Sequence, residues 1–530
     1  MPYAETLLLN GRLLTNAPRP ASALAVLGHR IIAVGGDDEI LALRGPRTRV
    51  IDLRGRFAVP GFTDSHVHLA ALSLGLSQVR LEDAATLEQA LRRIGARARK
   101  TPPGRWIRGR GFDKNRWGDD FPTRHELDRV APNHPVALHS RDGHSLWVNS
   151  LALRRCRITA KAKAPRGGVI VQDRRGQPTG ILQEAATSLI YSSPCFDEPR
   201  SEADDLSAGL RVLLKQGITS VHLMEEAPLF DQLQALRAEG GLRQRVTLYL
   251  SLASLDDLID AGVHSGFGDE WLRLGGVKLF MDGALGGQTA WLFEPYDNKP
   301  SGYRGVTAMP PKELRRHVRR AAEAGLACAI HAIGDRAVAE AIGALAAVRE
   351  HRTPLPHRVE HVQLVRPTEI AMFSKLGIVA SMQPCHILGD IETAERYWGR
   401  RCRYAYPVAS LLKSVAVLAF GSDAPVETAN PLAGIYAAVA RQTLDGRPKG
   451  GWYRKQEGIG VMAALRAYTV GPAVATGESH FKGRLARGYL ADIAVLSKDI
   501  RRLRGQALLT ARVDMAIVDG EVRYARAPRG

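Results

Sequence analysis

Short apolar runs recur along the chain and alternate with Ala- and Leu-rich stretches of helical spacing. Strands buried on both faces have continuous apolar sequences, and their alternation with helices is typical of βα units in a parallel sheet. Eight such runs predict an α/β fold, a closed (β/α)8 TIM-like barrel with its active site at the carboxyl ends of the strands. The runs are the segment that contains His66 and His68, and residues 217–223, 245–252, 275–280, 326–331, 358–362, 377–383 and 415–423.

The two ends of the chain have a different pattern, in which short strand-like segments are separated by turns. Residues 1–60 and 476–530 both show it, and we expect them to join into one small composite β-sandwich domain. The barrel then occupies residues 61–475. The interval after its first strand is too long for a single helix, so residues 70–205 are predicted to be an insertion that caps the substrate pocket.

Composition narrows the class of protein. The formal net charge of +19 suggests nucleic acid binding, but only 14 of the 73 basic residues are Lys, the charge is spread, and no nucleic-acid-reading motif is present. We interpret the basic runs at 314–320 and 501–504 as solvated faces and expect no nucleic acid partner. No run reaches the ~18 apolar residues of a membrane span, and the N-terminus lacks a secretory-signal pattern, so we predict a cytoplasmic protein without membrane contact.

The five cysteines show no spacing that is typical of a shared function. Their number is odd, and no CxxC motif occurs among them. This pattern indicates neither a disulfide framework nor a thiolate zinc site. We therefore expect the cysteines to be reduced and mostly structural.

His66 and His68 are the first candidates for metal chemistry. They stand at i and i+2 near the end of an apolar run, and in a strand these positions face the same side, so both imidazoles can reach one ion. A lone pair of this kind also occurs at ordinary polar strand ends, so the prediction depends on partners. A barrel would bring to the same rim four further ionisable residues that end apolar runs: Lys278, His331, His361 and Asp423.

Two of these residues have structural alternatives. Lys278 lies inside an apolar run, where a charged amine is costly unless something uses it, and a salt bridge with Asp282 or another carboxylate would satisfy it. Asp423 precedes Ala424-Pro425 and could be the N-cap of a helix. The sequence leaves both alternatives open.

The order HxH, Lys, His, His and Asp resembles that of the metal-dependent amidohydrolase superfamily. The long insertion and the segments DGHSLWVNS and KLFMDGALGGQTA are similar to those of its YtcJ-like branch, amidohydrolase family 3, which includes N-substituted formamide deformylases. The resemblance extends along essentially the whole chain. It implies a zinc-dependent hydrolase that acts on a carbon–nitrogen bond, N-formyl or N-acyl, of a small-molecule amide.

The resemblance also implies how two Zn2+ ions would be held. His66 and His68 would bind the more buried ion, and Asp423 would complete its shell. His331 and His361 would bind the second ion. Zinc accepts imidazole and carboxylate ligands, and it lowers the pKa of a bound water toward ~7.

Lys278 and Asp423 would have special roles in such a site. Lys278 resembles a lysine that many members of the superfamily carbamylate, and an N6-carboxylated Lys278 would bridge the two cations. An unmodified ammonium would be repelled by a dication, so metal binding and modification should be coupled. Asp423 is expected to be the general acid/base that takes a proton from the attacking water and delivers it to the leaving nitrogen.

Residues outside the ligand set are weaker candidates. Residues in the insertion or beside strand ends could contact substrate, although each could equally be a solvated or hydrogen-bonded structural side chain. Gln288 stands where the similar family segment has a basic residue, which leaves the polar end of the substrate undetermined. The predicted substrate-binding residues are His144, Asp142, Trp147, Asp282, Gln383 and His386, and roles for Glu184 and His222 are left open.

Other functions would use the same fold. A one-metal deaminase of the superfamily needs no lysine on the fourth strand, so Lys278 disfavours it. An esterase stays possible, because an ester substrate would present a similar carbonyl to the same site. A non-catalytic scaffold is disfavoured because the whole predicted ligand set is present. The substrate depends on pocket side chains that the sequence does not position, and a homodimer is expected only because it is the commonest oligomer.

Overall fold

The computed structural model describes residues 3–15, 20–76, 78–118, 120–141, 143–165, 168–196, 202–299 and 302–527. The chain divides into two compact units. The barrel unit consists of Met1–Ala70 and Leu206–Gly530, and the insertion unit consists of Ala71–Asp205. Among the described residues, no helix combines the length and the apolar character needed to cross a bilayer.

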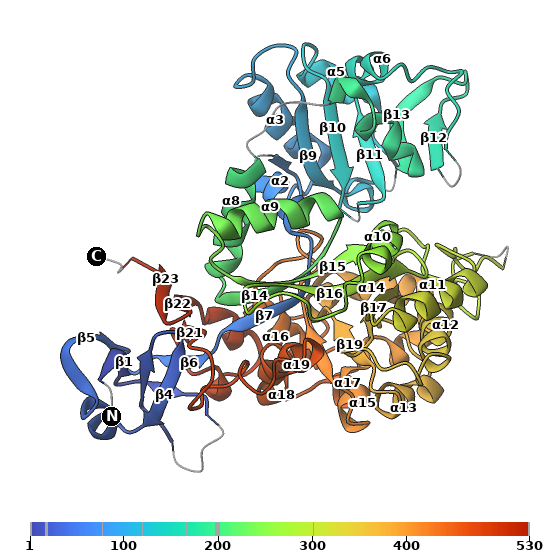
Figure 1. Ribbon diagram of the computed structural model, residues 1–530. Coiled ribbons are helices and arrows are strands. Elements are labelled where there is room, and N and C mark those ends of the chain that lie inside the picture. Colours follow the sequence, from blue (N-terminus) through green and yellow to red (C-terminus); the bar gives the residue numbers. More distant parts are fainter. Residues whose placement is uncertain are drawn as a thin grey trace. The chain divides into compact units, whose positions relative to one another are not determined.

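A sheet of eight parallel strands forms the centre of the barrel unit, which confirms the predicted (β/α)8 fold (Figure 1). The order of the strands in the sheet follows their order in the chain. Their side chains are buried on both faces because one face lines the barrel interior and helices cover the other. The strands are β7 (Phe62–Val67), β14 (Ile218–Glu225), β15 (Arg245–Ser251), β16 (Leu272–Phe280), β17 (Cys328–Ala332), β18 (Arg358–His361), β19 (Val379–Met382) and β20 (Leu418–Phe420).

The barrel closes where the residues after β20 meet the end of β7. The backbone N–H of Asp423 donates to the carbonyl oxygen of His66 at 2.7 Å, and that of His68 donates to Ala424 at 2.9 Å. A Cβ atom at Gly421 would lie 2.4 Å from the backbone nitrogen of His66, so this close approach requires glycine. The closure therefore fixes the HxH segment and Asp423 in register with each other.

Amphipathic helices follow most of the strands and pack on the outside of the barrel (Figure 1). In α11, Leu314, Val318, Ala321 and Ala322 are buried at helical spacing, and Pro311 begins the helix where a missing N–H costs nothing. The helices of this unit are α8 (Glu202–Leu214), α9 (Ala227–Ala238), α10 (Leu255–Asp260), α11 (Pro311–Glu323), α12 (Asp335–Ala346), α13 (Pro367–Lys375), α14 (Ile387–Trp398), α15 (Val408–Lys413), α16 (Pro431–Ala440), α17 (Arg454–Glu457), α18 (Val461–Ala467) and α19 (Val470–Ala475).

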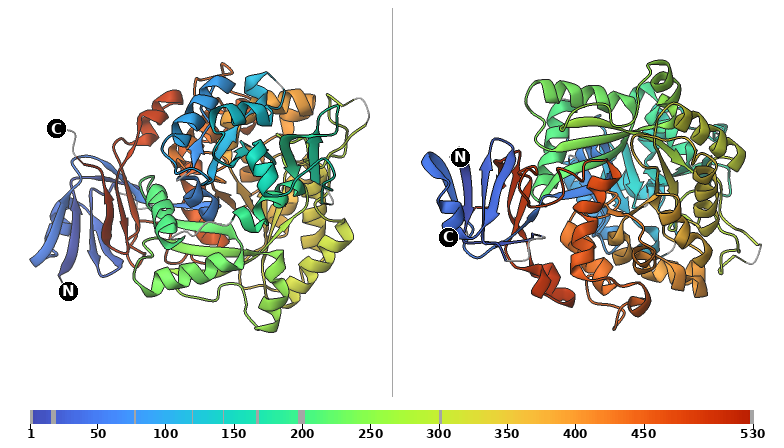
Figure 2. Two further views of the ribbon diagram at one scale, coloured as in Figure 1. Left: turned by 90° about the horizontal axis from the view of Figure 1, so that it is seen from above. Right: turned by 60° about the horizontal axis from the view of Figure 1, so that its bottom comes forward.

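Strands from both ends of the chain form a small β sandwich, as predicted. In Figure 2 the blue N-terminal strands lie beside the red C-terminal ones, and β6 pairs antiparallel with β21. Leu8 and Val26 from one sheet share an apolar cluster with Ile493 and Ile517 from the other. One sheet contains β4 (Arg30–Gly35), β3 (Ala23–Leu27), β1 (Ala4–Leu9) and β5 (Arg44–Asp52), and the other contains β2 (Arg12–Leu13), β6 (Phe57–Pro60), β21 (Ile493–Leu496), β22 (Val513–Val518) and β23 (Glu521–Ala525).

The insertion unit has its own six-stranded sheet and its own core. Trp147 and Phe112 belong to an apolar cluster that includes Leu91 of α3 and Leu127 of α5, and a second cluster contains Trp106 and Phe196. The role of this unit as a substrate cap stays a prediction. Its elements are β12 (Gly168–Gln172), β13 (Pro178–Glu184), β11 (Ser145–Val148), β10 (Val136–Ser140), β9 (Ile107–Phe112), β8 (Val79–Arg80), α3 (Leu87–Ala98), α4 (Lys114–Trp117), α5 (Arg124–Val130), α6 (Ser150–Arg155) and α7 (Ser188–Tyr191), and α2 (Leu69–Leu76) precedes them.

Candidate metal centre

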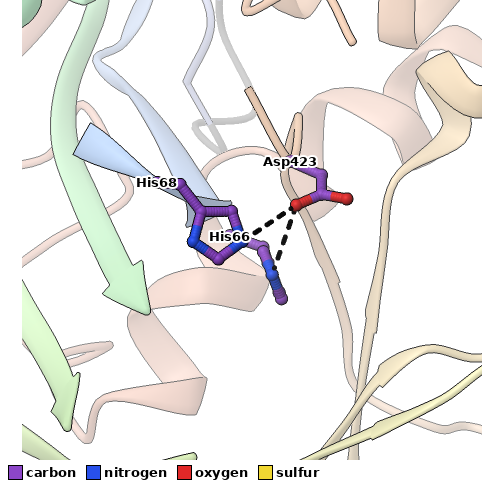
Figure 3. A group of neighbouring side chains, drawn as sticks. All are labelled: His66, His68 and Asp423. Atoms are coloured by element: carbon purple, nitrogen blue, oxygen red, sulfur yellow. Dashed lines mark ion pairs between the residues drawn. The ribbon is translucent and has the colours of Figure 1, made fainter. Parts of the chain in front are cut away.

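His66, His68 and Asp423 converge at the carboxyl ends of β7 and β20 (Figure 3). The Nε2 atoms of His66 and His68 lie 3.5 Å and 3.2 Å from the same carboxylate oxygen, Oδ1 of Asp423. Asp423 has a left-handed backbone with φ of 58° and does not cap a helix, because α16 begins at Pro431 with Asn430 as its N-cap. The N-cap alternative for Asp423 is therefore wrong.

A second group of possible ligand atoms shares the same aspartate. One atom each of His361, His386 and Asp423 lie within 4.8 Å of one another. His386 belongs to the 3-10 turn η4 (Pro384–His386) after β19, and its Nε2 lies 3.4 Å from Oδ2 of Asp423. The two oxygens of Asp423 thus face two different histidine groups.

His331 lies beside these groups. Its ring centroid is 4.4 Å from that of His361, but its Nε2 lies 3.0 Å from the carbonyl oxygen of Gly283. A carbonyl oxygen only accepts hydrogen bonds, so Nε2 carries the proton and Nδ1 is the nitrogen left for a ligand bond. His331 belongs to neither of the two groups of converging ligand atoms among the described residues.

Lys278 is buried on β16 with an exposed fraction of 3%, and its Nζ has no hydrogen-bond partner among the described residues. Asp282, one of the carboxylates that the salt-bridge alternative allows, is engaged elsewhere: it accepts the backbone N–H groups of Trp291, Ile333 and Gly334 at 2.8, 3.0 and 2.8 Å. The salt bridge between Lys278 and Asp282 is therefore absent. The Asp282 carboxylate organises the loop backbone, and substrate binding by Asp282 stays a prediction.

Burial and neighbouring charges set the protonation of the centre. Burial and the nearby Lys278 lower the pKa of His66 to about 4 and that of His331 to about 3, and burial and His331 place the pKa of His361 well below its ordinary value. Burial opposes the charge of Asp423, but hydrogen bonding from His386 and His68 holds its pKa well below the usual range. Near neutral pH, three imidazoles are therefore neutral and the carboxyl group is ionised, which are the forms that bind metal.

The side chains of this centre fit a divalent cation. Buried polar atoms in proteins nearly always have hydrogen-bond partners. Several ionisable atoms here have none within the described part of the chain: Nε2 of His66, Nδ1 of His361 and Nζ of Lys278. Imidazole nitrogens around a carboxylate are a donor set that suits zinc.

Glu360 and Arg358 support the centre from inside the barrel, and sequence reasoning missed both. Oε2 of Glu360 lies 2.6 Å from Nδ1 of His66 and accepts from Arg358 at 3.1 Å. Arg358 is fully buried and also donates to Ser65 O, Ser381 Oγ and His222 Nδ1. One feature of the sequence could have pointed to these two residues. They are a charged pair inside the apolar run RVEHV, in which Glu360 directly precedes His361.

Other predicted substrate contacts lie at different places in the barrel unit. Gln383 follows β19 and is buried, and its Nε2 lies 3.5 Å from the carbonyl oxygen of Ser381. His222 is buried in β14, where burial and Arg358 hold its pKa well below the usual range. Gln288 donates to Asn298 at 2.9 Å. A substrate role for Gln383 stays a prediction, and His386 is the predicted contact that the structure brings to the metal centre.

The remaining candidates belong to the insertion unit. Trp147 is fully buried in the core of that unit, and its Nε1 donates to Thr123 O at 2.7 Å, so its predicted contact with substrate is wrong. Nδ1 of His144 lies 2.9 Å from Oε2 of Glu184, which explains the position of that glutamate. Asp142 lies outside the described residues. Substrate binding by His144 stays a prediction.

The sequence matches the amidohydrolase family over residues 49–524. It is 31% identical to the putative amidohydrolase YtcJ of Bacillus subtilis over 493 residues, which cover 91% of each chain. It is 30% identical to N-substituted formamide deformylase of Arthrobacter pascens over 548 residues, which cover 98% of each chain.

The structure is also similar to a crystal structure of an uncharacterized metal-dependent hydrolase from Pyrococcus horikoshii. The TM-score is 0.77 at 30% sequence identity, and the match covers 94% of this chain and 98% of that one. The similarity therefore includes almost the whole of both chains.

Proposed function

The chain belongs to the amidohydrolase family, and from this premise we propose that it hydrolyses the carbon–nitrogen bond of a small-molecule N-formyl or N-acyl amide. Its YtcJ-like relatives and the similar metal-dependent hydrolase support hydrolysis at a metal centre. One observation carries the proposal: Asp423 faces His66 and His68 with one oxygen and His386 with the other, at the carboxyl ends of the barrel strands. This is the rim at which barrel enzymes bind their substrates.

Zinc is the proposed metal, because neutral imidazoles and a carboxylate are ligands that it accepts. His66, His68 and Asp423 would hold one ion, and His361 and His331 would contribute to a second. When bound, such an ion supplies Lewis acidity, which polarises a carbonyl oxygen and acidifies water. The lowered pKa values of His66, His331 and His361 keep these three imidazoles neutral, and their lone pairs are available for this purpose.

We propose that Lys278 is carboxylated at its Nζ. Carbon dioxide reacts with the neutral amine, and burial lowers the pKa of Lys278 to about 8, which raises the neutral fraction near physiological pH. Nζ of Lys278 has no hydrogen-bond partner among the residues that the structure describes, which supports the same conclusion, because a buried ammonium without a carboxylate partner is costly. The carbamate would replace a positive charge with a negative one between the histidines, where cations are expected.

Asp423 is the proposed general acid/base. Its ionised carboxylate can take a proton from water and deliver it to the leaving nitrogen. Burial of the side chain limits competition from bulk water, and the left-handed backbone aims the carboxylate at the histidines. Burial opposes the charge of His386, but hydrogen bonding and charge interaction with Asp423 raise its pKa to about 9, so a cationic His386 would favour the anion of Asp423.

The substrate class rests on the similarity to N-substituted formamide deformylase, which extends over 98% of both chains. An ester carbonyl would meet the same groups, so an esterase is the alternative. A one-metal deaminase is disfavoured by Lys278, whose buried amine would then have no use.

Reconstitution and a substrate panel test this proposal. Metal-free protein is loaded with Zn2+ in the presence of bicarbonate and assayed against matched N-formyl amines, N-acyl amines and esters of the same alkyl groups. We expect zinc-dependent turnover that is fastest for the N-formyl or N-acyl series. Faster ester hydrolysis would support the alternative, and turnover that survives complete metal removal would overturn the proposal.

A further inference from the structure

The sulfur atoms of Cys156 and Cys195 lie 3.1 Å apart in the insertion unit. Cys156 is the C-cap of α6, and Cys195 is the middle residue of the 3-10 turn η2 (Pro194–Phe196). Both residues are half-buried, whereas Cys328, Cys385 and Cys402 are buried. The separation of 3.1 Å exceeds the ~2.05 Å of a disulfide bond by only about 1 Å, which side-chain rotation can supply.

The fold holds the two sulfur atoms together. The start of α6 is anchored by Asn149, whose Oδ1 accepts from the N–H of Ala152 at 3.0 Å. The η2 turn is anchored by Trp106, whose Nε1 donates to the carbonyl oxygen of Cys195 at 2.7 Å, and the ring of Trp106 lies 4.7 Å from that of Phe196. Because both segments are anchored, the two thiols stay close to each other, and their effective concentration toward each other is high.

We propose that Cys156 and Cys195 are a reversible modification site, at which a small-molecule disulfide oxidises the two thiols to an intramolecular disulfide. One thiolate attacks the small disulfide, forms a mixed disulfide and releases one small thiolate. The second cysteine then attacks the protein sulfur of that mixed disulfide and releases the other small thiolate. Two electrons pass to the small molecule, and the two protons of the cysteines leave with its thiols.

Either sulfur can begin the exchange. Burial and the neighbouring Cys195 raise the pKa of Cys156, and Oγ of Ser193 lies 3.1 Å from Sγ of Cys195, where it can donate to a negatively charged sulfur. The cysteine that does not attack first is the residue that resolves the mixed disulfide.

The bond would constrain a defined part of the insertion unit. The two cysteines are 39 positions apart, and the enclosed segment contains β12 and β13 with Glu184, the partner of His144. A cross-link limits the freedom of the unfolded segment. Oxidation is therefore expected to protect residues 157–194 from local unfolding and from proteolysis.

Peptide mapping of the full-length, metal-loaded protein tests the proposal. The protein is equilibrated with mixtures of oxidised and reduced glutathione, alkylated in denaturant and digested. We expect a linked peptide pair that joins Cys156 to Cys195, an intact mass lower by two hydrogen atoms, and alkylated Cys328, Cys385 and Cys402. Stable glutathione adducts on either sulfur, or a bridge that uses another cysteine, would overturn the proposal.

Matched variants give a second readout. Cys156→Ser and Cys195→Ser should each abolish the linked pair, whereas Cys402→Ser, the control, should form it as the parent protein does. Limited proteolysis within residues 157–194 should be slower by at least several-fold in the oxidised parent, and dithiothreitol should reverse this protection. The mapping of the parent protein decides the proposal even if a serine variant folds poorly. Equal cleavage rates in both redox states would show that the bridge does not constrain the segment.

Discussion

The Nδ1 atom of His66 lies 2.6 Å from Oε2 of Glu360, and both side chains are fully buried inside the barrel. Burial opposes the charge of Glu360, but Arg358 holds its pKa well below the usual range. An ionised carboxylate can only accept, so Nδ1 of His66 carries the proton and Nε2 keeps its lone pair toward Asp423. The Glu360 carboxylate thus sets the tautomer that a metal ligand needs.

Glu360→Gln is therefore expected to weaken zinc binding by about 10- to 100-fold, the usual effect of removing the partner of a ligating histidine. The neutral amide neither strengthens the basicity of His66 nor fixes its tautomer. Competition with a chromophoric chelator measures the dissociation constant. An unchanged constant would show that Glu360 has no part in the orientation of His66.

A double variant separates this effect from misfolding. Glu360→Gln alone leaves the fully buried Arg358 without its charge partner, which costs about 3 to 5 kcal/mol of unfolding free energy when a buried pair is broken. Glu360→Gln/Arg358→Gln removes both charges and should recover much of that loss in urea unfolding. Zinc affinity should stay low in the double variant, because His66 still lacks its carboxylate.

Asp423→Asn tests the general acid/base. The amide oxygen can still face the metal, but it cannot take a proton, so we expect retained fold, most of the zinc, and a kcat lower by about 100-fold or more. Metal analysis and steady-state kinetics on the same preparation give the comparison. Asp390→Asn is the matched control, because that carboxylate accepts from Tyr406 and lies 4.0 Å from the far side of His386. Near-normal turnover of Asp423→Asn would remove Asp423 from proton transfer.

His386→Gln distinguishes two roles for the histidine that faces Asp423. Its Nε2 lies 3.4 Å from Oδ2 of Asp423, and the expected result is a kcat lower by about tenfold with zinc content and KM unchanged, since a positioned proton-transfer partner contributes at least that much. Zinc analysis and kinetics decide between the roles. The loss of one zinc equivalent would contradict this prediction and identify His386 as a ligand.

Lys278→Met tests the carbamate. Wild-type protein, stripped of metal and carbon dioxide, should bind more zinc when bicarbonate is added, because the carboxylated amine can bridge two cations. Lys278→Met should bind less zinc and should not respond to bicarbonate. Lys215→Met, which changes an exposed lysine at the end of α8, should behave as wild type. A bicarbonate response in Lys278→Met would place the effect at another group.

The barrel, and the strands that carry the candidate ligands, could be predicted because continuous apolar runs make a terminal His, Lys or Asp conspicuous. The contact between His66 and Glu360 could not be predicted. Glu360 is 294 positions away from His66 and lies inside an apolar run, and the two side chains meet only in the interior of the folded barrel. Trp147 was assigned to the pocket from its neighbours in the sequence. The packing of helices decides which face of a sheet becomes part of a core, and the sequence around Trp147 does not show that packing. In the structure the ring of Trp147 is buried against Phe112 and Trp117.

Glu478 lies at the opposite end of the barrel from the metal centre and should govern stability at acid pH. Its carboxylate lies 2.9 Å from Nζ of Lys482 and 3.3 Å from Nη1 of Arg273 at the start of β16. Burial opposes its charge, but Lys482 and the Thr476 hydroxyl hold the pKa of Glu478 below the ordinary value. A lowered pKa in the folded state adds stability above the ordinary value of about 4.3, and this stability disappears as pH falls through the folded-state pKa.

Glu478→Gln should therefore lower the free energy of unfolding by about 3 kcal/mol at neutral pH, because Lys482 is left as a buried charge without its partner. The gap between wild type and variant should close as pH falls below about 4, where the wild-type carboxyl group also becomes neutral. Urea unfolding across this pH range measures the gap. Glu521→Gln, at an exposed position of β23, is the control and should follow wild type. A gap that stays constant down to the acid limit would mean that packing, and not the charge of Glu478, causes the destabilisation.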